Sequence, residues 1–399
     1  MKIFFSFLLI IFLAFSGYHL TFRGFKLPLF ARRFYLTGTE FLFLGLLLGP
    51  HFTNIINTET SIRLEPITTF LLGWTGLLFG FQFELRKMLR FPIPLHLSAL
   101  LEGMSSAITV FGGAVLLSLF YFEFAWTRTL IAALALCAVA VPTAQTGLAM
   151  VVSESSEHQK NMVGNLKFVS GLDGLIAMLI LGVLFFFRPS LAVEEFPWLQ
   201  QGVSLLMVFF LFVGLFLLFG LFFIGRLAEN EMVLVVIAMT VIAGGAAAIL
   251  NFSPLLMNFL VGICLANMVR NKERIFNMLV GVEKPVYLLI LLFLGVNWYI
   301  PSVWVLGIAA GYSLIIGVGK IIGGFAFKQS LGSESLSPLF GLGLISPGGL
   351  TFAILLDLQK GFPYTMTTGI IGMALIAVMY NDMAGPHVLK WLIRHNQAV

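Results

Sequence analysis

Long apolar runs separated by short polar segments make up most of this 399-residue sequence. A helix rises about 1.5 Å per residue, so about 20 apolar residues cross the roughly 30 Å hydrocarbon layer of a membrane. The pattern therefore predicts an all-α polytopic membrane protein with 13 transmembrane helices. The expected ranges are 3–20, 34–50, 65–84, 95–120, 127–152, 162–187, 200–225, 231–250, 253–269, 285–300, 302–327, 337–357 and 365–389.

The composition supports this class. Hydrophobic residues make up 59% of the chain and charged residues 10%, whereas a soluble domain has about 25% charged residues. The net charge of +5 is small and lies mostly in loops on one side, so it indicates topology and not a nucleic-acid surface. Cys137 and Cys264 fall within apolar runs and are expected to be packed thiols, without a disulfide, a metal cluster or any cofactor.

The basic residues predict the orientation of the chain. Sixteen of the 23 Lys and Arg residues lie in loops after odd-numbered runs or at the C-terminus, and five lie on the opposite side. The positive-inside rule then places the N-terminus outside and the C-terminus in the cytoplasm. The first run resembles a signal peptide, but the four basic residues from Arg23 to Arg33 outweigh Lys2, so we expect it to be retained. No soluble domain follows the last run, so a regulatory subunit would be a separate chain.

Two of the runs contain matched interruptions. The fifth holds "AVAVPTAQTGLAM", with Pro142, Thr143 and Gln145, and the twelfth holds "GLGLISPGGLTFAIL", with Ser346 and Pro347. Irregular backbone at membrane depth is tolerated only where it is buried in protein or lines a cavity. The two runs are seven apart and so cross the membrane in opposite directions. Such a pair of broken helices is typical of an inverted-repeat transporter whose ion site lies at the breaks.

An aspartate lies in the middle of the sixth run. Asp173, in "FVSGLDGLIAML", is the only charged residue between positions 168 and 187, and it lies roughly 16 Å into the membrane. A carboxylate there costs about 2.5–3.5 kcal/mol, so such residues are usually functional. Ser170 and Asn165 lie one and two helical turns before it, and Lys320 lies within the eleventh run.

The chemistry of a buried carboxylate suits exchange between a proton and a small cation. Burial favours the protonated form, and a nearby cation favours the ionised form. We therefore expect Asp173 to bind one or the other, with Lys320 tuning its charge. A purely structural ion pair between these two residues is the alternative. Glu102, nearer a span end, is a secondary candidate, and Asp382 is expected to end the last helix near the inner surface.

Several segments resemble those of the Kef- and NapA-type cation:proton antiporters. "TEFLFLGLLLGPHF" is similar to the family's opening motif, and "LGWTGLLFGFQFELRKM" to its third span; "LLMNFLVGICLAN" and "VYLLILLFLGVNW" follow in the expected order. The resemblance covers nearly the whole chain. It implies a dimeric, elevator-type antiporter with an NhaA/NapA-like fold of inverted repeats and two crossed broken helices. The core would span about 95–187 and 302–389, and the scaffold and dimer surface about 28–90 and 200–300.

The resemblance also implies roles for individual residues. Thr143 occupies the first break, Pro347 the second, Asp173 the essential cation and proton site, and Lys320 the core-domain lysine. The chain departs from the family at Leu172, where an Asp, Asn or Gln usually precedes the essential aspartate. A single carboxylate favours one-for-one, electroneutral exchange.

The sequence therefore predicts a secondary transporter, not an enzyme, that exchanges Na+ or K+ for protons. Membrane lipid and a second copy of the chain are its expected partners, and the bacterial inner membrane its expected location. An uncoupled or K+-efflux-type channel of the same fold is one alternative, and an intramembrane aspartic protease using Asp173 and Asp382 is another. The expected ion shell and its supporting residues are Asp173, Thr143, Gln145, Ser346, Pro142, Pro347, Lys320, Ser170, Asn165 and Glu102.

Overall fold

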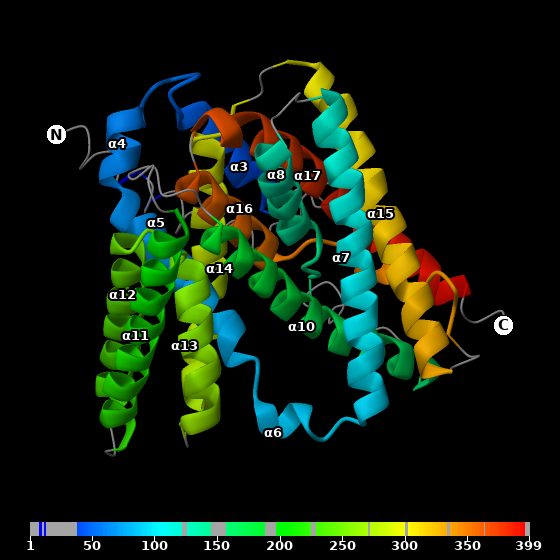
Figure 1. Ribbon diagram of the computed structural model, residues 1–399, viewed down its shortest axis with the longest axis horizontal. Coiled ribbons are helices and arrows are strands. Elements are labelled where there is room, and N and C mark those ends of the chain that lie inside the picture. The colour runs from blue at the N-terminus through cyan, green and yellow to red at the C-terminus, as the bar shows by residue number, and fades with distance from the viewer. Residues whose placement is uncertain are drawn as a thin grey trace. The chain divides into compact units, whose positions relative to one another are not determined.

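The structure is a computed structural model that describes residues 8, 9, 12, 38–121, 126–144, 157–187, 197–224, 229–269, 272–299, 302–332, 336–362 and 364–395. Within these ranges every regular element is a helix (Figure 1), which confirms the expected all-α class. The helices are α3 (Thr39–Leu48), α4 (Thr58–Arg63), α5 (Glu65–Phe81), α6 (Leu85–Met88), α7 (Ile93–Tyr121), α8 (Trp126–Ala140), α10 (Glu157–Phe186), α11 (Pro197–Ile224), α12 (Glu229–Ile249), α13 (Pro254–Met268), α14 (Lys272–Val296), α15 (Trp304–Leu331), the 3-10 helix η1 (Phe340–Leu344), α16 (Gly349–Gly361) and α17 (Tyr364–His395).

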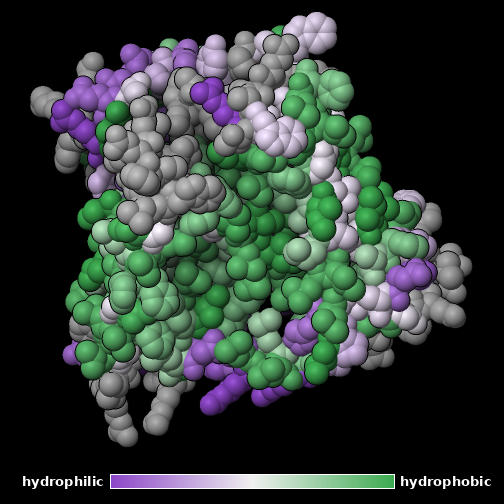
Figure 2. Space-filling view, viewed as in Figure 1, coloured by the Kyte–Doolittle hydropathy of each residue, from purple (hydrophilic) through white to green (hydrophobic). Residues whose placement is uncertain are grey.

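Twelve of the thirteen predicted runs overlap helices of the structure, although α14 begins at Lys272, well before the predicted run 285–300. The first run, 3–20, lies outside the described residues except at positions 8, 9 and 12. Six of the described helices are long and apolar enough to cross a membrane. Hydrophobic residues cover most of the visible face in Figure 2, and the large exposed side chains include Ile108 on α7 and Leu314 on α15. Such a surface suits contact with lipid.

The chain divides into two compact units. Unit 1 comprises residues 1–88, 185–299 and 359–361, and unit 2 comprises 89–184, 300–358 and 362–399. In unit 1, α3 packs against α14 and α5 packs against α13. Small residues allow these approaches, because a Cβ on Gly76 would overlap the carbonyl of Leu255 and one on Gly295 that of Leu42.

Unit 2 is organised around the contact between α7 and α15, which lie side by side (Figure 1). Glycines on α15 face α7: a Cβ on Gly319 would lie 3.1 Å from the carbonyl oxygen of Ser106, and one on Gly323 would lie 2.7 Å from that of Glu102. The next residue, Gly324, packs against Gly341 of η1. Close backbone packing therefore fixes α15 between α7 and the second predicted break.

In the described residues the helical backbone stops at both predicted breaks, and the two non-helical stretches lie against each other. Helix α8 ends at Ala140, and residues 141–144 are not helical; η1 is separated from α16 by non-helical residues 345–348. The backbone N–H of Ala144 donates to the carbonyl of Ser346 over 2.8 Å, and a Cβ on Gly348 would lie 3.0 Å from the Cα of Ala144. The two interruptions thus form one region of irregular backbone in unit 2.

The last helix corrects one expectation. Asp382 does not end it, because α17 continues through Asp382 and Pro386 to His395. An aspartate side chain leaves the backbone hydrogen bonds of a helix intact, so a single Asp is a weak stop signal without a following glycine or a change of backbone direction.

Candidate ion-binding site

The centre of unit 2 holds a buried ion pair. Asp173 of α10 and Lys320 of α15 are 0% and 1% exposed, and Lys320 Nζ lies 2.6 Å from Asp173 Oδ2. Removing either charge from water costs several kcal/mol, so neither side chain is expected to be buried alone. The two charges that the sequence places in separate membrane helices therefore meet at one point.

Oxygen atoms from both breaks surround this pair. Lys320 Nζ donates to the carbonyl of Val141 over 2.9 Å and to Thr143 Oγ1 over 3.3 Å. The Thr143 hydroxyl lies 2.9 Å from Asp173 Oδ2 and 3.0 Å from the carbonyl oxygen of Leu344. Because a hydroxyl carries one hydrogen, it donates to one of these two oxygens at a time. The ammonium of Lys320 thus occupies a position lined by oxygen atoms.

Local sequence explains why these oxygens are available. Pro142 lacks a backbone N–H and crowds the preceding turn, so it cannot continue the hydrogen-bond ladder of α8. The carbonyls at the end of that helix then lack helical partners, and the carbonyl of Val141 turns to Lys320. At the second break, Pro347 and Gly348 separate η1 from α16, and the carbonyl of Leu344 is free to accept from Thr143.

A second carboxylate lies beside the pair. Glu102 of α7 is fully buried, and its Oε1 atom lies 3.9 Å from Lys320 Nζ. Its carboxyl group lies beside that of Asp173, and no other described residue donates a hydrogen bond to either of its oxygens. Because α7 begins at Ile93, Glu102 lies about 14 Å from the helix start and not near its end. Gly323 of α15 lies against Glu102, because a Cβ on this glycine would be 2.8 Å from Glu102 Oε1.

The remaining candidates take different positions. Ser170 is buried, but its hydroxyl donates to the carbonyl of Lys167 over 2.9 Å. Asn165 is half-buried on the same helix, farther from Asp173. The backbone carbonyl of Ser346 accepts a hydrogen bond from the backbone N–H of Ala144. Pro142 and Pro347 are buried at their breaks. Gln145 lies outside the described residues.

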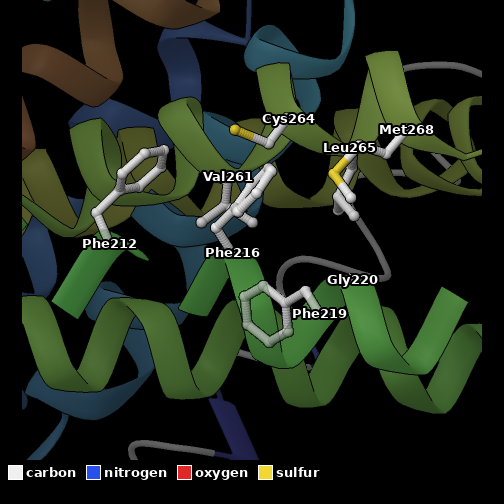
Figure 3. Close-up of a pocket in the computed structure, with 8 residues that line it drawn as sticks. All are labelled: Phe212, Phe216, Phe219, Gly220, Val261, Cys264, Leu265 and Met268. Atoms are coloured by element: carbon white, nitrogen blue, oxygen red, sulfur yellow. The ribbon is translucent and has the colours of Figure 1, made fainter. Parts of the chain in front are cut away.

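Two further features of the described chain can be compared with this site. The described residues contain no group of three or more His, Cys, Asp and Glu side chains that could hold a metal ion. A pocket in unit 1 lies between α11 and α13 (Figure 3) and is lined by Phe212, Phe216, Phe219, Gly220, Val261, Cys264, Leu265 and Met268. These lining side chains carry no oxygen, so they cannot supply the ligands that an alkali cation needs.

Comparison with known proteins decides the class. Residues 10–391 match the family described as "Sodium/hydrogen exchanger, transmembrane". The chain belongs to the sodium/hydrogen exchanger family. Membership makes it an integral membrane transporter of the cation/proton antiport class, as expected, and not an enzyme, so the aspartic protease alternative is wrong. No curated protein sequence matches the chain.

A solved structure supports the fold of this exchanger. The sodium proton antiporter MjNhaP1 from Methanocaldococcus jannaschii, determined at pH 8, matches with a TM-score of 0.65. The match covers 98% of this chain and 100% of that one, at 15% sequence identity. At this identity the likeness concerns the fold alone, and it confirms the predicted fold class.

Proposed function

We propose that the protein exchanges Na+ or K+ for protons and that Asp173 is the single essential carboxylate that binds the cation. The observation that carries this proposal is the set of oxygens around the Lys320 ammonium: Asp173 Oδ2, Thr143 Oγ1 and the Val141 carbonyl. Carboxylate, hydroxyl and unwound backbone carbonyl oxygens are the ligands by which broken-helix transporters hold alkali cations. A monovalent cation has the same charge as the ammonium and can replace it there.

The coupling between cation movement and proton movement follows from the burial of Asp173. A carboxylate at 0% exposure is stable in its ionised form only beside a positive charge, here the Lys320 ammonium or the transported cation, and otherwise it takes up a proton and becomes neutral. The second carboxylate oxygen, Oδ1, has no hydrogen-bond partner among the described residues and is available as a further ligand. Cation and proton exclude each other at Asp173, so each crossing of one requires the return of the other.

Unit 2 supplies every group in this arrangement. Val141, Thr143, Asp173, Lys320 and Leu344 all belong to it. A site carried by one compact unit can move with that unit, and this supports an elevator-type cycle in which unit 2 is the mobile core. Unit 1 would be the scaffold and the dimer surface, in a bacterial inner membrane with the C-terminus in the cytoplasm.

Reconstituted liposomes test this proposal. Addition of Na+ or K+ to one side should drive protons to the other in the wild type, without dependence on an imposed voltage. Asp173→Asn should abolish this proton movement, whereas Asp382→Asn, a carboxylate-to-amide change in α17, should retain it. Cation movement that proceeds without protons, or that survives in Asp173→Asn, would overturn the proposal and favour an uncoupled channel.

A further inference from the structure

We propose that Glu102 is a second anchor for Lys320: when a cation occupies Asp173, the displaced ammonium moves to the Glu102 carboxylate. This inference rests on the proposed function and deepens it by naming a positioning residue. Glu102 would not bind the transported ion. It would act through Lys320, by giving the lysine an ionic partner in the state in which Asp173 is occupied.

The distances place Lys320 between two carboxylates. Its Nζ atom lies 2.6 Å from Asp173 Oδ2 and 3.9 Å from Glu102 Oε1. A small rotation of a flexible lysine side chain is enough to exchange one close contact for the other. The step moves the ammonium group from one carboxylate to the other, and Lys320 keeps its proton.

The burial of Glu102 and its lack of a hydrogen-bond donor among the described residues indicate that it gains an ionic partner in another state of the transport cycle. The side chain is 0% exposed, its carboxyl group lies beside that of Asp173, and no other described residue donates a hydrogen bond to either of its oxygens. A buried acceptor without a donor is destabilising, and a donor that reaches it in another state of the protein would remove this cost. Lys320 Nζ is the cationic atom within ion-pair distance of it.

The packing of α7 on α15 is shaped to bring Glu102 to this position. A Cβ on Gly323 would lie 2.8 Å from Glu102 Oε1, so a larger residue there would push the carboxylate away. Gly323 and Lys320 are three residues apart and share a face of α15. On α7, a Cβ on Gly103 would lie 3.1 Å from Asp173 Oδ1. Glycines thus leave room for both carboxylates around one lysine.

The electrostatic reason for a second anchor is the cation-bound state. When a cation replaces the ammonium at Asp173, Lys320 becomes a buried charge whose original partner is taken. An unpaired buried ammonium is strongly unfavourable, and this would weaken cation binding by the same free energy. With Glu102 in reach, the ammonium exchanges one ion pair for another, and the cation binds without leaving a lone charge.

Isothermal titration calorimetry of Na+ binding to the purified full-length protein tests this inference, with choline chloride keeping the ionic strength constant. Glu102→Gln should raise the Kd for Na+ about tenfold or more, because the displaced ammonium then lacks an anionic partner. Glu102→Asp keeps the charge and should raise the Kd less. Ser106→Ala, a buried neighbour one turn along α7, is the matched control and should stay within about twofold.

A double-mutant cycle separates this role from simple attraction of the cation by a nearby negative charge. In a Lys320→Gln background there is no ammonium to move, so Glu102→Gln should change the Kd by less than about twofold. An unchanged Kd in the single Glu102→Gln variant would overturn the inference. So would the same rise in the Lys320→Gln background, because Glu102 would then act on the cation directly.

Two further comparisons keep the result interpretable. If Glu102→Gln fails to give a monodisperse folded protein, Glu102→Asp takes its place, and its smaller rise should likewise vanish in the Lys320→Gln background. Asp173→Asn should abolish Na+ binding in the same assay. Wild-type binding by Asp173→Asn would refute the proposed function itself, whereas lost binding together with an ineffective Glu102 variant would refute only the second anchor.

Discussion

Lys320 Nζ lies 2.6 Å from Asp173 Oδ2, and both side chains are buried in unit 2. A structural ion pair and a transport site are alternatives when read from the sequence. The geometry makes them compatible, because the ammonium rests on the same oxygens that an alkali cation would use. In the proposed cycle the pair stabilises the site when no cation is bound, and its opening admits the ion.

The hydroxyl of Thr143 should contribute to cation affinity. It contacts both Asp173 and Lys320, and its replacement in Thr143→Val removes one oxygen ligand while keeping the side-chain shape. Loss of a hydrogen bond or ligand to a charged group costs about 1.5–3 kcal/mol, so the Na+ concentration for half-maximal proton release should rise about tenfold or more. Thr143→Ser, which keeps the hydroxyl, should remain close to wild type; equal values for the Val and Ser variants would contradict this role.

Removing the lysine should make the protein depend on its cargo for stability. Lys320→Gln leaves Asp173 buried without its ion-pair partner, a change that costs about 3–5 kcal/mol. The variant should melt at a lower temperature than wild type in choline chloride, and Na+ should raise its melting temperature by more than it raises that of the wild type. Melting curves in the two salts measure this, and equal stabilisation of both proteins by Na+ would count against a cation site at Asp173.

Close packing of α15 against η1 should be sensitive to a single methyl group. A Cβ on Gly341 would overlap the carbonyl oxygen of Lys320, so Gly341→Ala should destabilise the protein by about 1–3 kcal/mol through overpacking. Gly317→Ala is the matched control on α15, because a Cβ there meets nothing within 4 Å. Thermal unfolding in detergent compares the two variants, and equal melting temperatures would show that this contact does not constrain the site.

The predicted orientation can be tested with two exposed positions. The side chains of Arg63 and Lys87 are 58% and 66% exposed, and the basic-residue count places Arg63 outside and Lys87 inside. In a chain with Cys137 and Cys264 replaced by alanine, a membrane-impermeant maleimide should label Arg63→Cys in right-side-out vesicles. It should label Lys87→Cys only in inside-out vesicles, and the reverse pattern would invert the topology.

The apolar runs predicted the helices well because lipid imposes the same demand on every span: backbone groups must be satisfied within the helix. The breaks at Pro142 and Pro347 were also readable, since proline removes a backbone donor wherever it stands. The pairing of Asp173 with Lys320 was foreseen as an alternative, because two isolated charges at membrane depth favour each other. Orientation and the division into core and scaffold stay predictions.

The closeness of Glu102 to Lys320 could not be predicted from the sequence in the same way. Its approach to Lys320 depends on where α7 crosses α15, and Gly323 sets that crossing through contacts between residues distant in sequence. Ser170 lies on the expected stripe, yet its hydroxyl bonds to the backbone of its own helix. Such local hydrogen bonds compete with tertiary ones, and the spacing of residues does not decide between them.

Structures determined in saturating Na+ and in choline, with K+ as a third condition, would show whether the transported cation displaces Lys320. In Na+, or in K+ if K+ is the transported cation, we expect an ion in contact with Asp173, Thr143 and the Val141 carbonyl. Lys320 Nζ should then lie beyond the roughly 4 Å ion-pair distance from Asp173, and in choline the pair should remain closed. A closed Asp173–Lys320 pair at a cation concentration that supports full exchange would show that the cation does not displace Lys320.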